Sequence, residues 1–162
     1  MKIAIFGNMD VETGADDEIK RYHILKFYPN TKAAGLFDRV YVSNAIPELP
    51  RDEVMPFLDK LRKTIAIGGE LIVQVPMAEY ACKQIFMNKP DLMTYYMLYG
   101  NDAQPFRACY TMMQIRTLLA RAGFNIREAT EAILKLTTTT GEVVDLPVHS
   151  LVAGLSSNPG GL

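Results

Sequence analysis

Short apolar runs that end at polar or glycine residues mark two strands near the start of this chain. Residues 2–6 read KIAIF and stop at Gly7, and residues 37–43 read FDRVYVS and stop at Asn44. Runs of this length, rich in β-branched and aromatic residues and closed by turn formers, are typical of buried strands. Residues 8–36 are less regular, and they have room for about one more strand and one short helix.

A helix and another strand follow the second run. From residue 51 to residue 67 the apolar positions recur at the spacing of an amphipathic helix, with Asp52 as its N-terminal cap and Gly68-Gly69 as its C-terminal end. We therefore assign the two glycines to a helix end rather than to a ligand-binding loop. The run ELIVQVP at 70–76 is again typical of a strand. Strand, helix and strand in this order predict parallel strands joined by a right-handed crossover.

The second half of the chain predicts helices and then an antiparallel pair of strands. Residues 78–99 are rich in Met and Tyr and are expected to be helical in part, and residues 111–122 have the spacing of an amphipathic helix. A strand that begins at Asn125 or Glu131 and a final strand form an antiparallel addition over 131–156. The fold class is therefore α/β, with a Rossmann-like, mostly parallel sheet, flanking helices and an antiparallel C-terminal strand pair.

Composition predicts one domain without a strong charge. The 162 residues are enough for a single core, and residues 1–157 are assigned to it, with 158–162 as a frayed tail. Lys and Arg number 17 against 18 for Asp and Glu, so no charge excess favours nucleic acid or a membrane as partner. Cys82 and Cys109 lack the spacing of a zinc site, and a cytoplasmic protein with reduced thiols and no metal is expected. A homo-oligomer or a protein partner stays open.

The order of the later segments resembles that of an enzyme family. FDRVYVSNAIPELP at 37–50, FLDKLRKTIAIGGELIVQVP at 57–76 and YTMMQIRTLLARAGFN at 110–125 stand in the order found in class I S-adenosylmethionine-dependent methyltransferases. In that family a strand beginning Phe-Asp precedes a helix, a Gly-Gly turn and a strand ending in Val-Pro. The likeness covers about residues 37–124, and it implies a Rossmann-like fold with S-adenosylmethionine as the cofactor.

The resemblance implies a cofactor site at the carboxyl ends of the first strands, where ligands bind in open α/β sheets. By position, Gly7 and Asn8 would let the backbone approach the methionine part of the cofactor, and Ser43 and Asn44 would hydrogen-bond to it. In the acidic pair Asp16-Asp17, Asp17 is the candidate acceptor for the ribose hydroxyls. The alternative for this pair is a solvated acidic loop or the first turn of a helix.

Candidates for the site of the methyl acceptor come from the second half of the chain. Tyr99 could wall a substrate and Arg107 could meet an anionic group, although Tyr at helical spacing is more often core and an exposed arginine is common. No acidic partner is evident for His23 or His149, and a structural role is expected for each. No catalytic residue is assigned, because methyl transfer from a sulfonium chiefly needs an in-line approach at close range.

Two departures from the family pattern keep a second hypothesis open. No second glycine follows Gly7 until Gly14, so the glycine-rich loop is incomplete and the cofactor half is short. Asn44, Pro47 and Glu48 stand where the relatives have a His and then a Glu-His pair. The chain is therefore either an S-adenosylmethionine-dependent methyltransferase with an unidentified acceptor, or a protein of the same fold that has lost the cofactor and serves as a binding or assembly subunit.

Overall fold

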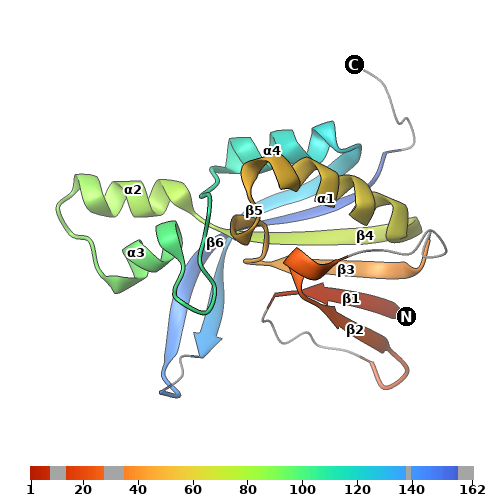
Figure 1. Cartoon of the computed structure of the whole chain (residues 1–162), viewed down its shortest axis with the longest axis horizontal. Helices are drawn as coiled ribbons and strands as arrows, with labels where there is room; N and C mark the ends of the chain where they lie inside the picture. The colour runs from red at the N-terminus through yellow and green to blue at the C-terminus, as the bar shows by residue number, and fades with distance from the viewer. Residues whose placement is uncertain (8–13, 28–34, 138–139, 157–162) are drawn as a thin grey trace.

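In the computed structural model, six strands form one sheet in the order β2-β1-β3-β4-β6-β5 (Figure 1). The structure describes residues 1–7, 14–27, 35–137 and 140–156. The four parallel strands are β1 (Lys2–Phe6), β2 (Glu18–Tyr22), β3 (Phe37–Ser43) and β4 (Ile65–Pro76). The antiparallel pair consists of β5 (Phe124–Thr137) and β6 (Val143–Leu155). This arrangement confirms the predicted fold class, and the C-terminal pair begins earlier than residue 131.

The two longest helices of the described residues pack on one face of this sheet. α1 (Arg51–Thr64) connects β3 to β4, and α2 (Ala78–Phe86), α3 (Leu92–Tyr99) and α4 (Met112–Arg121) lie between β4 and β5. α1 and α4 lie side by side over the sheet, whereas α2 and α3 project beyond it (Figure 1). Within the described ranges, no helix is both long and apolar enough to cross a membrane. Single 3-10 turns follow two strands: η1 (Ile24–Lys26) after β2 and η3 (Ile46–Glu48) after β3.

Alternation along the strands determines which side chains form the core. Every second residue of β1, β3 and β4 is buried in the main cluster, together with the apolar stripes of α1 and α4: Ala4, Phe6, Val40, Val42, Leu71, Val73, Val54, Leu58, Leu61, Ile115 and Leu119. Side chains one residue out of step point to the other face. There Arg39 lies 2.7 Å from Glu70, and Arg127 lies 3.5 Å from the same carboxylate. The helix-covered face is therefore apolar. The opposite face carries this charged cluster on β3, β4 and β5, and on β1 it carries the buried Ile3 and Ile5.

The Gly-Gly pair belongs to a strand and not to a helix end, which corrects the prediction from the sequence. α1 ends at Thr64 and β4 begins at Ile65, so Gly68 and Gly69 lie inside β4. The pairing of β3 with β4 shifts register at this point. Gly68 has a φ of +82°, and a Cβ atom on Gly69 would lie 2.9 Å from the carbonyl oxygen of Asp38. The two glycines therefore make a bulge, which needs the same backbone freedom as a helix end.

The start of α1 also differs from the prediction. Pro50 is the N-cap residue, and its side chain makes no capping hydrogen bond. Asp52 lies inside that turn instead of before it. A carboxylate there interacts favourably with the helix dipole.

Gly7 follows β1 and lies against the backbone at the end of β3. This close approach leads to a first prediction. Its φ is +97°, and a Cβ atom there would overlap the carbonyl oxygen of Ser43. Gly7→Ala should lower the free energy of unfolding by roughly 2 to 4 kcal/mol, because steric overlap adds to the cost of a positive φ. Gly141 has a φ of +84° with nothing within 4 Å of a Cβ position. In urea unfolding Gly141→Ala should lose only the backbone part, about 1 to 2 kcal/mol; equal losses would contradict the contact with Ser43.

Candidate functional site

The carboxyl ends of β1 and β3 are neighbours at one edge of the sheet, because these two strands pair in parallel. Gly7 follows β1, and Ser43 and Asn44 stand at the end of β3. A side chain at Gly7 would meet the backbone of Ser43 directly. The structure therefore brings together three of the five residues predicted for the cofactor. Asn8 lies outside the described residues.

Asn44 is the most constrained of these residues. Its φ is +53°, and the residue is 3% exposed. Its backbone N–H donates to the carbonyl of Gln74 at 2.9 Å, and its own carbonyl accepts from Gln104 Nε2 at 3.1 Å. The side-chain Oδ1 is buried and has no hydrogen-bond partner in the part of the chain that the structure describes. A buried acceptor without a donor costs about 1–3 kcal/mol, so a ligand that brings a donor would be stabilised there.

Gly7 and Ser43 already have contacts within the described part of the protein, in contrast to the Oδ1 atom of Asn44. The Ser43 side chain is buried, and its Oγ donates to Oε1 of Gln74 at 3.0 Å. The space that a Cβ atom on Gly7 would occupy already holds the Ser43 carbonyl. Gly7 thus allows the ends of β1 and β3 to approach each other closely. The Ser43 hydroxyl is used in a hydrogen bond to Gln74 of β4. Of the three, Asn44 alone has an unused polar atom among the described residues.

Asp17 lies at the opposite edge of the sheet from the β3 end. β1 and β2 run parallel, and Asp17 comes just before β2 begins at Glu18. Its carboxylate is 3.1 Å from the N-terminal ammonium of Met1 and accepts the N–H of Gly14 at 2.7 Å. The Gly14 hydrogen bond and the N-terminus hold the pKa of Asp17 below its usual value. The structure therefore does not bring Asp17 together with Asn44.

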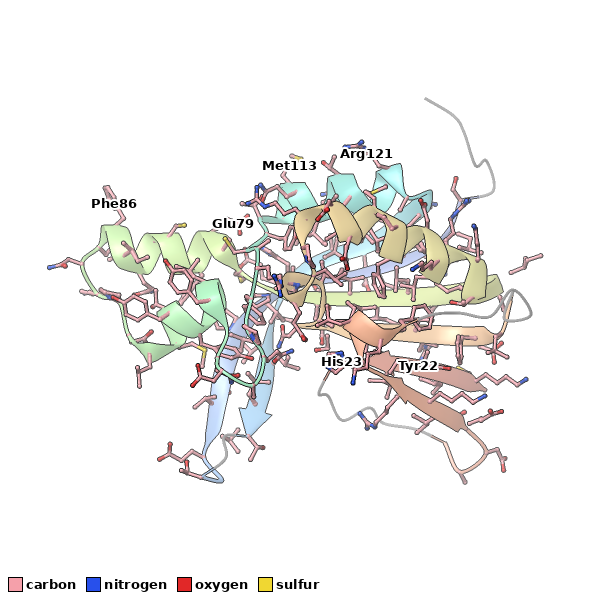
Figure 2. All side chains as sticks on the ribbon, in the orientation of Figure 1. Tyr22, His23, Glu79, Phe86, Met113 and Arg121 are labelled. Atoms are coloured by element: carbon pink, nitrogen blue, oxygen red, sulfur yellow. The ribbon has the colours of Figure 1, made fainter. Side chains whose placement is uncertain are left out.

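Tyr22 and His23 stand at the carboxyl end of β2 (Figure 2). The described residues that follow β2, up to residue 27, contain no Asp or Glu that could accept from the ribose hydroxyls. His23 Nδ1 accepts the N–H of Leu25 at 3.3 Å and so caps η1. Tyr22 stacks on Phe6 with ring centroids 5.4 Å apart. Both side chains stabilise the local structure, which is the role expected for His23.

Gln104 links the loop after α3 to the loop after β3, a contact that sequence reasoning missed. Its Nε2 donates to Glu48 Oε1 at 2.8 Å and to the Asn44 carbonyl at 3.1 Å. Its Oε1 accepts from the Tyr96 hydroxyl at 3.3 Å. Burial and the charge of Glu48 raise the pKa of Tyr96, so this hydroxyl stays protonated and can donate. Gln104 sits in an irregular loop, where no periodicity or motif signals such a role.

Arg107 and Tyr99 lie on the segment that approaches this network. The backbone N–H of Arg107 donates to the Pro47 carbonyl at 2.7 Å, next to Glu48, while its side chain is exposed. Tyr99 ends α3 with an exposed ring, and its carbonyl accepts the N–H of Phe106 at 2.8 Å. The fold thus brings the segment of both predicted acceptor residues toward the β3 end, with their side chains facing solvent.

His149 has an acidic partner, which corrects the expectation from the sequence. Its ring is buried in β6, and Nε2 lies 2.7 Å from Glu79 Oε2. Glu79 Oε1 also accepts the backbone N–H of Met112 at 2.9 Å. Glu79 stands in the first turn of α2 and Met112 begins α4, so one carboxylate connects two helix starts to the sheet (Figure 2). The residues of the pair are 70 positions apart, beyond the reach of a local pattern.

This pair generates a prediction about pH. Burial raises the pKa of Glu79, but the hydrogen bonds from His149 and Met112 outweigh it and hold the pKa below its usual value. A carboxylate with a lowered pKa stabilises the folded state at neutral pH and loses this contribution as the pH falls through its folded pKa. For this half-exposed group, Glu79→Gln should cost about 1 kcal/mol at pH 7, and the difference from wild type should shrink between about pH 5 and pH 3.

Urea unfolding at a series of pH values measures this difference. Glu53→Gln is the matched control, because Glu53 is also a first-turn carboxylate and is exposed at the start of α1. Its effect should be limited to the helix dipole, a few tenths of a kcal/mol. A loss in Glu79→Gln that stays constant from neutral to acid pH would show that the carboxylate charge does not stabilise this contact.

Comparison with solved structures identifies the fold. The chain aligns with an S-adenosylmethionine-dependent methyltransferase of Methanosarcina mazei with a TM-score of 0.59 and 13% identity, over 96% of this chain and 93% of that one. It aligns with a protein solved in connection with the conversion of a disulfide bond into a thioacetal group during echinomycin biosynthesis, with a TM-score of 0.57 and 15% identity, over 89% of this chain and 58% of that one.

A third alignment is with the 1,6-didemethyltoxoflavin-N1-methyltransferase of Burkholderia thailandensis, solved with S-adenosylhomocysteine, with a TM-score of 0.54 and 12% identity, over 87% of this chain and 52% of that one. The chain thus spans little more than half the length of two of these three proteins. The sequence matches no protein-family model and has no significant match among the curated proteins. The fold is the Rossmann-like fold of the class I methyltransferases, as the resemblance implied.

Proposed function

We propose that this chain binds S-adenosylmethionine at the carboxyl ends of β1 and β3 and transfers its methyl group to an acceptor. The observation that carries the proposal is the buried Oδ1 of Asn44, which has no hydrogen-bond partner among the described residues, at this edge of a sheet with methyltransferase topology. The methionine part of the cofactor carries an ammonium group, and an ammonium is a donor that fits an amide oxygen. Bound there, the cofactor would supply a methyl group on a positively charged sulfonium. The chain would contribute orientation.

The described residues would divide the binding as follows. Asn44 would accept from the cofactor, and Gln104 would keep Asn44 in place by its hydrogen bond to the Asn44 carbonyl. Gly7 would hold the two strand ends in contact. Ser43 would bind the cofactor only if its hydroxyl turned away from Gln74, to which it now donates.

The remaining candidate residues take different roles in this proposal, or none. Asn8 follows Gly7 in the chain and stays a candidate for a backbone contact with the cofactor. Asp17 is bound to the N-terminus at the opposite edge, so the ribose hydroxyls have no assigned acceptor. The methyl acceptor would approach over the end of α3, at Tyr99, and the loop after it, which contains Arg107. A guanidinium at that position would suit an acceptor with an anionic group.

A second function is favoured by the apolar side chains exposed on α2 and α3. Phe86 and Leu92 are 91% and 89% exposed around the turn between these helices, which project away from the sheet (Figures 1 and 2). Such a surface is typical of a contact with a protein partner or a second copy of the chain. The chain would then be a binding or assembly subunit built on a methyltransferase fold. In either role, the free thiols of Cys82 and Cys109 fit a cytoplasmic setting.

Calorimetric titration with S-adenosylmethionine and S-adenosylhomocysteine tests the first function. We expect a micromolar dissociation constant, about 8 kcal/mol of binding free energy. Asn44→Gly should weaken binding roughly 5- to 10-fold, because it removes one hydrogen bond of about 1 to 1.5 kcal/mol while glycine tolerates the positive φ. Asn88→Gly is the matched control, since Asn88 has a φ of +55° at the end of α2.

The outcomes separate the two functions. Weaker binding in Asn44→Gly with unchanged binding in Asn88→Gly supports the cofactor site. No heat and no thermal shift with either ligand at millimolar concentration would contradict cofactor binding and favour the assembly role. Equal weakening in both variants would place the cofactor away from Asn44.

A further inference from the structure

A cavity of about 310 Å³ opens between α1 and α4, on the helix-covered side of the sheet. It is lined by residues that include Arg51, Val54, Cys109, Tyr110, Met113 and Leu118, none of which is proposed to bind the cofactor. A volume of this size is at the lower end of the range for small-molecule sites. The cavity therefore fits a small ligand rather than a protein segment.

Apolar side chains form most of the walls. Val54 is buried and Leu118 is partly buried, so the floor belongs to the main core. Met113 is 73% exposed in the first turn of α4 (Figure 2). An apolar ligand that covers such side chains gains roughly 25 cal/mol for each Å² that it removes from water. The ligand should therefore have an apolar body.

Tyr110 adds an unused hydrogen-bond donor. The residue is 6% exposed, and its hydroxyl is buried with no partner in the described part of the chain. Burial raises the pKa of Tyr110 and outweighs the opposite effect of the positive charge of Arg51, which lines the same cavity. The hydroxyl is therefore protonated at neutral pH and able to donate. A buried donor of this kind is rarely left without an acceptor.

The charge around the cavity is positive. Arg51 alone among the lining residues carries a charge, and it is the first residue of α1, whose N-cap residue Pro50 makes no side-chain capping bond. The first turns of α1 and α4 both contribute to the lining, through Val54 and Met113. Each helix start carries a partial positive charge. The acidic residues of the first turn of α1, Asp52 and Glu53, do not line the cavity.

We propose that this cavity binds a small organic anion with an apolar body, such as a medium-chain fatty acid or an aromatic carboxylate. The carboxylate would lie toward Arg51 and accept the hydroxyl proton of Tyr110 in a hydrogen bond. The apolar body would lie between α1 and α4. The positive charge favours an anion over a neutral molecule of the same shape. This site does not depend on the binding of S-adenosylmethionine.

The two cysteines of the chain provide a local test, because Cys109 lines the cavity and Cys82 is exposed on α2. Octanoate is the probe, and 1-octanol is its uncharged analogue. The alkylation of each cysteine of the full chain by iodoacetamide is followed by mass spectrometry while the probe is titrated. We expect octanoate at millimolar concentration to slow alkylation of Cys109 while the rate at Cys82 stays unchanged. The dissociation constant for octanol, measured from the protection of Cys109, should be at least about fivefold higher than that for octanoate.

Variants connect this protection to the proposed contacts. Arg51→Gln should raise the dissociation constant of octanoate about tenfold and remove the preference over octanol, because it removes a charge-assisted hydrogen bond. Tyr110→Phe keeps the ring and should raise the constant about fivefold. Arg121→Gln, in the last turn of α4 and outside the lining, is the matched control and should bind as wild type does (Figure 2).

The proposal fails under two results. One is an unchanged rate at Cys109 with octanoate at millimolar concentration. The other is equal protection in Arg51→Gln and wild type, which would show that the anion does not contact the guanidinium. Arg51 is exposed, so its substitution should leave the fold intact, and a thermal melt checks this. Because S-adenosylmethionine is absent from the assay, failure here and failure of cofactor binding are separate results.

Discussion

The parallel pairing of β1 with β3 is the contact on which the rest of this molecule depends. It places two strand ends that are distant in the sequence at one edge of the sheet, where Gly7 lies against the backbone of Ser43. The turn after β3 then leads into α1, and the N-terminus of α4 lies toward the same edge (Figure 1). The buried Oδ1 of Asn44, which has no partner among the described residues, and the N-termini of α1 and α4 therefore lie at this edge, because the parallel strands share one direction and the helices that cross over between strands run back in the opposite direction.

The two faces of the sheet differ in the side chains that they carry and in how these are covered. Under α1 and α4 the strands carry apolar side chains that need this cover. On the other face Arg39 makes two hydrogen bonds to Glu70, at 2.7 and 3.1 Å, and Arg127 extends the ion pair toward β5. Exposed ion pairs contribute little stability, but they let a sheet surface remain in contact with water. On β1 this face carries Ile3 and Ile5, each 1% exposed, so the face is apolar at β1 and charged at β3, β4 and β5.

Local signals explain what the sequence could predict. The strands at 2–6 and 37–43 and the helix that ends before Gly123 were predicted correctly, because short apolar runs, helical spacing and turn formers all lie within a few residues of each other. The pair Gly68-Gly69 was assigned wrongly, since two glycines serve equally at a helix end and at a bulge. What decides between them is the pairing of Ile65 with Phe37, a contact between distant residues.

The same distinction holds for the candidate site. Gly7, Ser43 and Asn44 could be grouped from the sequence, because each stands at the end of a predicted strand. Asp17 could not be placed, because the start of β2 at Glu18 follows from its pairing with β1. The hydrogen bond from Gln104 to Asn44 spans 60 residues, and only the folded chain shows it.

The connection from β3 to α1 relates the two proposed ligand sites. Asn44 stands at its start, and Arg51 at its end is the first residue of α1. The Pro47 carbonyl accepts the N–H groups of Arg107 and Ala108, at 2.7 and 3.3 Å, and the Gln104 side chain holds the Asn44 carbonyl. Hydrogen bonds from the loop that leads from α3 to α4 therefore hold the backbone between the two sites in place. Asn44 and Arg51 are therefore positioned relative to each other by the fold before any ligand arrives, which lowers the ordering entropy that binding at either site would cost.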